Sequence, residues 1–388
     1  MGKKTSIKVV SIIEPVGGHG GMEFIDYELC KSVINKGYKV LFFTSDKTKL
    51  FTIKGLDVFF YFRGIYGKAP KIFRVFLFIL HISRSLIASR FRSSRIVHYH
   101  LFRATILELI MMYLTKMLGF KIVISAHDVE SFAESNTNAI VKKVYQSADS
   151  IIAHSLIGYI EIRDKFKIKE SKISQIPLGN YIDYLPRLID RKKSRSSFNI
   201  IDESPVLLFF GQIKKVKGLD VLLNALPLVI NKYPNVKLII AGKLWQTGFS
   251  EYEKIISENK LNDFINLNLR YISDEIVEQF FYAADITILP YRKIYQSAVL
   301  LLGMSAGCPI LASNITGMSE IIQDGENGFL FENDNYISLS EKIIKILGDK
   351  NKLTQVKENA LEYVINNHSW DKVGQLTSTV YDSIWSKK

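Results

Sequence analysis

The chain alternates short apolar runs with longer segments whose apolar residues recur every three or four positions. In the first half, the apolar runs lie at 7–13, 38–44, 95–100 and 120–126, and segments with helical spacing lie between them. A glycine-rich turn at 15–21 leads into a helix that ends near Gly37. Strands that alternate with helices in this way form a parallel sheet covered on both faces. We therefore predict a doubly wound α/β domain.

The alternation is interrupted at 181–204, which is polar and basic, and then restarts at 205–210. Further apolar runs follow at 236–242, 264–271 and 286–290, again separated by helical segments. A chain of 388 residues also exceeds one ordinary core. We expect a linker at 181–204 between two doubly wound domains, 1–187 and 188–369. A C-terminal helix, at about 370–388, is expected to return to the first domain.

The composition is that of a globular protein, with 47% hydrophobic and 23% charged residues. Its two cysteines, Cys30 and Cys308, lie in apolar surroundings and indicate buried thiols in a reducing compartment. We expect no signal peptide, because a strand begins almost at once. We also expect no spanning helix, because the longest apolar run, 75–82, is interrupted by His81 and then by Ser83 and Arg84.

The net charge of +13 is concentrated in the first half, where residues 1–200 hold 32 Lys and Arg against 16 Asp and Glu. No acidic residue occurs between Asp57 and Glu108. Such asymmetry indicates an anionic partner: nucleic acid, an anionic lipid surface or a phosphorylated acceptor. Within the acid-free stretch, 68–95 has helical spacing, and a helical wheel places five basic residues on one arc: Lys71, Arg74, Arg84, Arg92 and Arg95. A basic amphipathic helix is typical of membrane-surface binding, and the alternative is a helix on the sheet with a solvated basic face.

Two motifs in the first half lie where ligands bind in open α/β sheets, beyond the carboxyl ends of strands. The GGHGG sequence at 17–21 is either a phosphate or sugar loop or a plain tight turn. The SAHD sequence at 125–128 places His127 and Asp128 at the end of an apolar strand, where a ligand-facing role competes with simple loop capping. His98 and His100 end another strand and are weaker candidates.

Two motifs in the second half suit a phosphorylated ligand. The turn GQIKKVKGLD, at 211–220, places Lys214 and Lys217 beside the start of a helix, where they either neutralise a diphosphate or are solvated. The stretch 290–331 predicts two successive helix N-termini facing one crevice. Gln296 and Ser297 precede the first helix, and Ser297 is also a good N-cap. The second helix begins near 317–320, so Glu320 caps it, stabilises its positive end or reaches a ligand hydroxyl.

These motifs, together with AADITILPY at 283–291 and SAGCPILASNITGMSEIIQDGENGFLF at 305–331, resemble the GT-B glycosyltransferases of family 4. The resemblance covers nearly the whole chain. It implies two Rossmann-like domains facing across a cleft, with the active site between them. In such enzymes the C-terminal domain binds the nucleotide sugar and the N-terminal domain binds the acceptor. The resemblance implies neither a metal nor a cofactor, because helix N-termini and basic side chains stabilise the leaving diphosphate.

The resemblance also implies roles for single residues. Lys217 matches the diphosphate-binding lysine, and Lys214 supplies the charge that the family often places at Gln212. His127 matches the histidine near the donor sugar, and Gly20 and Gly21 match the glycine loop under the reacting centre.

The family's E-x7-E motif aligns with Ile294 and Leu302, so both of its glutamates are absent. A subset of exopolysaccharide-type enzymes is similar here. Donor recognition would then depend on backbone N–H groups, Gln296, Ser297 and Glu320.

The resulting hypothesis is a metal-independent, retaining glycosyltransferase of bacterial surface polysaccharide biosynthesis. It moves a sugar from a nucleotide-diphosphate sugar to a polyprenyl-diphosphate-linked saccharide. We expect it in the cytoplasm, peripheral on the inner face of the cell membrane, with the acceptor and membrane side formed by His100, Lys71, Arg74, Arg84 and Arg92. An inverting enzyme that uses His127, Asp128 or Glu130 as its base, and a nucleotide-sugar epimerase, are the alternatives. A nucleic-acid-binding protein is disfavoured because the chain shows no recognised nucleic-acid module.

Overall fold

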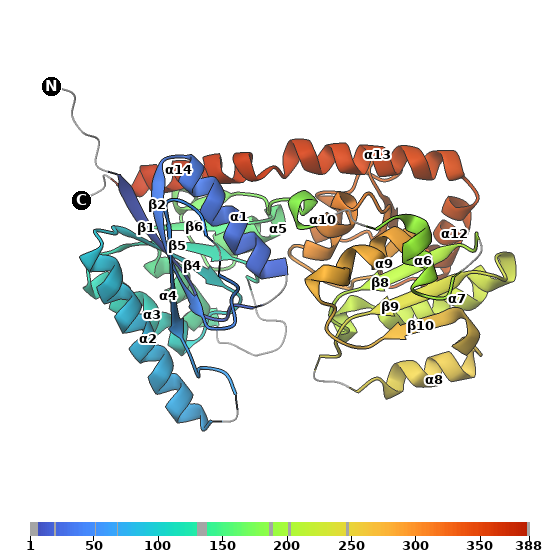
Figure 1. Ribbon diagram of the computed structural model, residues 1–388, viewed down its shortest axis with the longest axis horizontal. Coiled ribbons are helices and arrows are strands. Elements are labelled where there is room, and N and C mark those ends of the chain that lie inside the picture. The colour runs from blue at the N-terminus through green and yellow to red at the C-terminus, as the bar shows by residue number, and fades with distance from the viewer. Residues whose placement is uncertain are drawn as a thin grey trace. The chain divides into compact units, whose positions relative to one another are not determined.

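The computed structural model describes residues 7–18, 21–50, 52–67, 69–129, 138–185, 189–200, 203–245 and 248–385. The chain divides into two compact units (Figure 1). Unit 1 comprises Met1–Gly179 and Ser369–Lys388, and unit 2 comprises Asn180–His368.

Unit 1 is built on a seven-stranded parallel sheet with the order β3-β2-β1-β4-β5-β6-β7. The strand order reverses between β1 and β4, which makes their carboxyl ends the topological switch point. The central strands are almost completely buried, as expected for a parallel sheet covered on both faces. The strands are β1 (Lys8–Glu14), β2 (Tyr38–Ser45), β3 (Leu56–Phe62), β4 (Ile96–Leu101), β5 (Lys121–Ala126), β6 (Ser150–Ala153) and β7 (Ile173–Gln175).

Helices from the two ends of the chain pack side by side in unit 1. α1 (Gly21–Asn35) contacts α14 (Trp370–Trp385), and both contribute to one apolar core with β1, β2 and β5. The hydroxyl of Tyr381 on α14 lies 2.7 Å from Nδ1 of His98 on β4. The remaining helices of this unit are α2 (Lys71–Phe91), α3 (Ile106–Met117), α4 (Asn138–Ser147), α5 (Leu156–Asp164) and the 3-10 turn η1 (Glu170–Lys172).

Unit 2 contains a six-stranded parallel sheet with the order β10-β9-β8-β11-β12-β13, and its switch point lies between β8 and β11. Its strands are β8 (Val206–Phe210), β9 (Lys237–Ala241), β10 (Ile265–Asn268), β11 (Ile286–Leu289), β12 (Ile310–Ser313) and β13 (Phe329–Phe331). Its α-helices are α6 (Arg191–Ser196), α7 (Leu219–Lys232), α8 (Ser250–Glu258), α9 (Val277–Ala283), α10 (Ala298–Ser305), α11 (Thr316–Ser319), α12 (Tyr336–Leu347) and α13 (Lys350–Asn367). The 3-10 turns are η2 (Ile182–Tyr184), η3 (Lys215–Lys217), η4 (Asn262–Phe264) and η5 (Asp274–Ile276). The predicted class, two doubly wound α/β domains, is confirmed.

The division between the units lies at Gly179/Asn180 rather than at 187/188. The backbone N–H of Asn180 donates to the carbonyl oxygen of His368 at 2.7 Å, and its side-chain amide donates to the carbonyl oxygen of Val364. The N–H of Tyr181 donates to Ser305 Oγ at 2.9 Å. These contacts attach 180–185 to α10 and α13, and therefore to unit 2.

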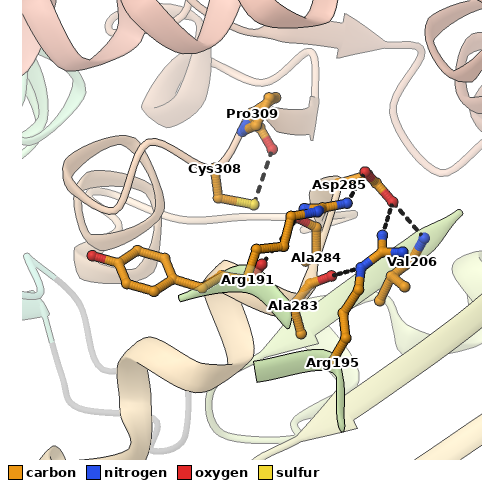
Figure 2. A network of polar contacts seen from close by, with 9 residues as sticks. Arg191, Arg195, Val206, Ala283, Ala284, Asp285, Cys308 and Pro309 are labelled. Atoms are coloured by element: carbon orange, nitrogen blue, oxygen red, sulfur yellow. Dashed lines mark hydrogen bonds and ion pairs between the residues drawn. The ribbon is translucent and has the colours of Figure 1, made fainter. Parts of the chain in front are cut away.

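The expectation of a linker at 181–204 is wrong, because α6 is fastened to unit 2 by ion pairs (Figure 2). Arg191 and the buried Arg195 both donate to the carboxylate of Asp285, and Arg195 Nε donates to the carbonyl oxygen of Ala283 at 3.2 Å. Asp285 also accepts the N–H of Val206 at 2.8 Å. Two of the basic residues that gave the segment its linker-like composition therefore donate to acceptors around β8 and β11.

The expectation of no spanning helix stays a prediction. Among the described residues, α2 passes the test of length and apolarity, with 21 residues and a mean hydropathy of 1.6 in its best window. His81, Ser83 and Arg84 lower this hydropathy without abolishing it. Length and composition alone are weak grounds, since helices of soluble cores have the same properties.

Candidate functional site

In unit 2, the loops that follow β8 and β11 are in contact at the switch point. Gly218, between η3 and α7, has a φ of +66°, and a Cβ there would lie 1.9 Å from the carbonyl oxygen of Pro290. A similar approach occurs between Gly242, with a φ of +145°, and the carbonyl oxygen of Gly211. These two approaches show that the loops after β8, β9 and β11 converge on one edge of the sheet. Glycine is needed at both positions, because a side chain would collide with the neighbouring backbone. Ligands bind at this edge in open α/β sheets.

The two lysines expected to bind a diphosphate are held at this edge by aromatic rings. Lys217 Nζ lies 3.6 Å from the ring centroid of Tyr291, and Lys214 Nζ lies 4.5 Å from that of Trp245. Both lysines are half-buried, whereas Gln212 in the same loop is exposed. Cation–π contacts of this kind position an ammonium group while leaving it charged. The alternative expectation, that both lysines are fully solvated, therefore does not hold.

Arg292, which the sequence interpretation missed, fastens the lysine-bearing turn. Its guanidinium donates to both carboxylate oxygens of Asp220, at 2.9 and 2.6 Å, and to the carbonyl oxygen of Lys215 at 2.9 Å. It also donates to Asp334 at 2.8 Å. These carboxylates raise the pKa of Arg292, so the clamp stays charged. The sequence contained both partners of this ion pair in recognisable places: an Asp in the first turn of α7 and an Arg just after β11.

Of the two helix starts predicted in 290–331, one is a full helix and the other is a single turn. Ser297 Oγ accepts the N–H of Leu300 at 3.2 Å and caps α10, directly after the half-buried Gln296. α11 spans Thr316–Ser319, and Glu320 lies at its C-terminal end. The expectation that Glu320 caps this helix or stabilises its positive end is therefore wrong.

The positions aligned with the missing glutamates are apolar and packed. A Cβ on Gly317 would lie 2.2 Å from the carbonyl oxygen of Ile294, so the start of α11 rests on that residue. Leu302 is buried in α10. Gln212, Lys214, Lys217, Gln296 and Ser297 are thus the polar groups that the structure brings to the carboxyl edge of β8 and β11.

In unit 1, four histidines form a row: His98, His100 and His127 are buried on β4 and after β5, and the half-buried His154 follows β6. Neighbouring rings have centroids 5.1 Å apart for His98 and His100, 5.1 Å for His100 and His127, and 4.8 Å for His127 and His154. The ring of Phe102 stacks on His127 at 4.7 Å. Among the described residues, no three His, Cys, Asp or Glu side chains are arranged to hold a metal ion.

Burial keeps His98, His127 and His154 uncharged at neutral pH. It lowers the pKa of His98 and His127 well below the ordinary value and that of His154 to about 4. His98 is structural, because its Nε2 lies 2.9 Å from Ser125 Oγ and its Nδ1 contacts the hydroxyl of Tyr381. His127 is enclosed by neighbouring rings, and Asp128 beside it is half-buried.

The first half of the GGHGG motif makes a tight turn. Gly17 and Gly18 have φ values of +59° and +62°, and a Cβ on Gly17 would lie 2.2 Å from Thr48 Oγ1. Gly21 begins α1. His19, Gly20 and Glu130 lie outside the described residues.

The basic residues of 68–95 do not form one face. α2 ends at Phe91, and Arg92 is its C-cap. Arg84 lies over the ring of Tyr61 at 5.0 Å, and Arg92 lies over that of Phe59 at 4.7 Å, so both cover aromatic residues of β3. Arg95 lies over Trp385. The expectation of one shared basic arc is therefore wrong, because aromatic rings of the domain attract three of its five members.

Lys71, Arg74 and His100 are instead brought together around a cavity of about 500 Å³. The cavity lies at the carboxyl ends of β1 and β4, between α2 and α3, and all of its lining residues belong to unit 1. This edge of the sheet is the switch point of unit 1.

Glu14 and Asp26 beside this cavity were missed. Glu14 ends β1, is buried, and accepts the N–H groups of Val16 and Gly17. Burial and the nearby Asp26 raise the pKa of Glu14 to about 7. Asp26 Oδ1 lies 2.8 Å from Nδ1 of the buried His100. Glu14 could have been identified from the sequence, because it directly follows an apolar run. The SAHD motif had been selected on the same ground.

Two family models match the chain in tandem. Residues 19–182 match Glycosyltransferase Family 4, and residues 190–363 match Glycosyl transferases group 1. Among solved structures, sucrose-phosphate synthase from Thermosynechococcus elongatus superposes with a TM-score of 0.79 at 16% identity, covering 98% of this chain and 100% of that chain. Anabaena HepE, crystallised with UDP, gives a TM-score of 0.74 at 17% identity and covers 97% and 100%.

Curated relatives agree with these models. The N-acetyl-alpha-D-glucosaminyl L-malate synthase of Bacillus anthracis is 23% identical over 93% of both chains. The capsular polysaccharide biosynthesis glycosyltransferase CapM of Staphylococcus aureus is 24% identical over 55% of this chain and 56% of its own length. With both halves matched by such models and each unit built on a doubly wound parallel sheet, the chain belongs to the family 4 glycosyltransferases, with a glycosyl transferases group 1 domain in unit 2.

Proposed function

We propose that this glycosyltransferase moves a sugar from a nucleoside-diphosphate sugar to a lipid-linked saccharide during bacterial surface-polysaccharide synthesis. The observation that carries the proposal is the pair of ring-held lysines, Lys214 and Lys217, at the switch point of unit 2. The similar HepE structure is described in complex with UDP-glucose, and the relative CapM is named for capsule synthesis. Both support a nucleotide-sugar donor and a surface-glycan product.

The proposed chemistry needs stabilisation of a departing nucleoside diphosphate. Negative charge develops on its phosphate as the glycosidic carbon is released, and fixed cations and N–H groups stabilise that charge best when they are already in place. Lys214, Lys217 and the start of α10 supply such groups from side chains and backbone. No metal is included in the proposal, because these groups suffice for the charge.

We propose retention of the anomeric configuration. An inverting reaction needs a general base, and a buried imidazole whose pKa is lowered well below its ordinary value, as in His127, is a weak base at neutral pH. In retention, the leaving phosphate itself accepts the proton of the acceptor hydroxyl. Proton NMR of the product anomer tests this, and an inverted product would transfer the role of base to Asp128.

Replacing Lys217 tests the donor site. Lys217→Ala is expected to lower turnover by roughly tenfold to a hundredfold, because it removes one charge-assisted contact to the diphosphate. Lys215→Ala is the matched control, since that lysine lies in the same turn with a side chain that is 77% exposed beside Glu251. Thermal shifts with UDP-, GDP-, dTDP- and ADP-sugars identify the donor beforehand. Equal turnover in the two variants would contradict the role of Lys217.

An epimerase would act on the nucleotide sugar without an acceptor. Incubation with the donor alone, followed by product analysis, separates the two activities. We expect no epimerised nucleotide sugar in that reaction, and its appearance would replace transfer as the function.

We also propose that unit 1 docks on the cytoplasmic face of the cell membrane. α2 and α3 are in contact and expose large apolar side chains, including Ile72 at 83%, Phe91 at 85% and Met117 at 81%. These helices lie in or next to the stretch that lacks acidic residues, so anionic lipids complement the surface. The support is thus an apolar surface in basic surroundings, and not the basic arc expected from the sequence.

Flotation with anionic liposomes tests this docking. The protein is expected to float, and the double variant Ile72→Asp with Phe76→Asp is expected to stay at the bottom, because both side chains are exposed on α2. Ile337→Asp, at an exposed apolar position on α12 of unit 2, is the matched control. If the control and the double variant float alike, α2 does not contact the membrane.

A further inference from the structure

The cavity between α2 and α3 is amphipathic, with charge at one part of its lining and apolar side chains at another. α2 contributes Lys71, Arg74, Val75 and Phe78, whose spacing places them on one side of the helix. α3 contributes Leu107 and Met111, and Arg103 precedes that helix; Ile65 and Tyr66 close the lining before α2. A volume of about 500 Å³ is in the range of small-molecule sites.

Two cations of the lining, Lys71 and Arg74, are available to a ligand, whereas its acidic side chains are already engaged. Arg74 Nε is buried, and no described residue accepts its hydrogen. No ion pair involves Lys71 among the described residues. Glu14 accepts the N–H groups of Val16 and Gly17.

Glu108, the other acidic residue in the lining, is engaged as well. It accepts the N–H of Thr105 at 2.8 Å in the capping box of α3, and Arg103 Nε lies 3.7 Å from its second oxygen. A buried guanidinium N–H without an acceptor, such as that of Arg74 Nε, is costly, and an anionic ligand supplies that acceptor.

The apolar side chains that line the cavity lie on the side of α2 opposite to the exposed apolar side chains of that helix. Val75 and Phe78 face the cavity, while Phe73, Phe76 and Leu80 of α2 are exposed on the surface. A ligand that combines an anionic head with hydrocarbon can therefore place its head against the cations and its first hydrocarbon units against Val75, Phe78 and Met111.

From this arrangement we propose that the cavity binds the phosphate head and the first hydrocarbon units of the lipid that carries the acceptor saccharide. The inference rests on the proposed function, which it deepens by assigning the lipid phosphate to a site in unit 1. Arg74 and Lys71 contact the phosphate oxygens, and Val75, Phe78 and Met111 contact the hydrocarbon. Arg84 and Arg92, which stack on β3, take no part.

Binding to the unmodified protein distinguishes a lipid phosphate from its separate parts. Calorimetric titrations use farnesyl diphosphate, farnesol and inorganic diphosphate as probes. Farnesyl diphosphate is expected to bind at least tenfold more tightly than either of the other two, because it alone engages both parts of the lining. Equal affinity for inorganic diphosphate would reduce the cavity to a simple anion site and overturn the assignment of a lipid.

Single variants place that binding in the cavity. Arg74→Gln is expected to weaken farnesyl diphosphate by roughly tenfold to a hundredfold, the loss of one charge-assisted contact. Arg84→Gln, a cation of the same helix outside the cavity, is the matched control and should bind as the unmodified protein does. Val75→Trp fills the apolar part while retaining both cations, and is expected to abolish the preference for farnesyl diphosphate over inorganic diphosphate. Melting curves of each variant establish that it is folded.

The donor site supplies the check that separates this inference from the proposed function. Nucleotide-sugar binding, measured by thermal shift, depends on Lys217 in unit 2 and should be unchanged in Arg74→Gln and Val75→Trp. If nucleotide sugars bind but farnesyl diphosphate does not, or if Arg74→Gln binds it normally, the cavity assignment is overturned and the transferase function stands. If no nucleotide sugar binds, the proposed function fails whatever the cavity does.

Discussion

Glu14, at the switch point of unit 1, has a pKa that its sequence context does not reveal. Glu14 lies at the end of β1, where burial and Asp26 raise its pKa to about 7 from an ordinary value of 4.5. His100 on β4 and Tyr66 before α2 also interact electrostatically with Glu14. The carboxyl therefore changes its charge near neutral pH, within a cavity that we assign to an anionic ligand.

This raised pKa makes stability depend on pH. The folded state keeps the Glu14 proton to a higher pH than the unfolded state, so the contribution of Glu14 to stability is lost as pH rises from 4.5 to about 7. Glu14→Gln cannot ionise and avoids a cost of about 3 kcal/mol above that range. We expect urea unfolding at pH 5 and pH 8 to show the variant gaining stability relative to the unmodified protein at the higher pH. A stability difference that is constant across this range would contradict the raised pKa.

Residue types alone could locate some of the site but not its contacts. Lys214 and Lys217 were found because lysines beside a glycine turn after an apolar strand indicate a phosphate site. An arginine over an aromatic ring, such as Arg84 on Tyr61, has the same sequence signature as a solvated one. The basic face of 68–95 was therefore overestimated, while the carboxyl groups of Glu14 and Asp26 were overlooked.

At the scale of elements, the turn between η3 and α7 depends on the close approach of Gly218 to Pro290. Gly218→Ala is expected to destabilise unit 2 by about 3 kcal/mol and to lower turnover, since strain at positive φ adds to a clash with a backbone oxygen. Gly37→Ala is the matched control: its φ is +90° and nothing lies within 4 Å of the new Cβ, so its cost is the backbone strain of about 1 kcal/mol. Chemical denaturation measures both, and equal losses would contradict the importance of the contact.

A second element-scale prediction concerns α6. Asp285→Ala leaves Arg195 buried without its carboxylate and is expected to cost about 2 kcal/mol, below the figure for a fully buried pair because Asp285 is 22% exposed. Limited proteolysis should then cut within 189–200 faster than in the unmodified protein. Asp263→Ala, on the surface of the same unit, serves as control. Unchanged proteolysis would contradict the fastening of α6 by this pair.

The central strands were predicted well because they are buried on both faces, so that apolar runs mark them directly, whereas the half-buried β3 and the short β7 were not predicted. Elements stabilised by polar contacts were not predicted, since α6 owes its place to Asp285 and α11 is a single turn resting on Ile294. The charge and turn composition of a sequence segment do not show which distant residue it will contact.

At the scale of the whole molecule, the chain leaves unit 1, forms unit 2 and returns. A chain ending at His368 lacks α14, and with it the contact of Tyr381 to His98 and the apolar residues packed on α1. We expect the melting temperature of unit 1 to fall, while unit 2 melts as before. Trp245 is the sole tryptophan left in such a chain, so its fluorescence reports unit 2 alone. Fluorescence and circular dichroism should then give separate transitions, and coincident ones at the original temperature would contradict the dependence of unit 1 on α14.

The late return of α14 has a consequence for synthesis on the ribosome. About 190 residues separate the two parts of unit 1, which take roughly 10–40 s to translate at about 5–20 residues per second. During that interval the face of the first sheet that α14 covers remains open, although all seven of its strands have been made. All of unit 2 is therefore synthesised before unit 1 has its last helix, so unit 1 cannot bury this face until α14 has been made.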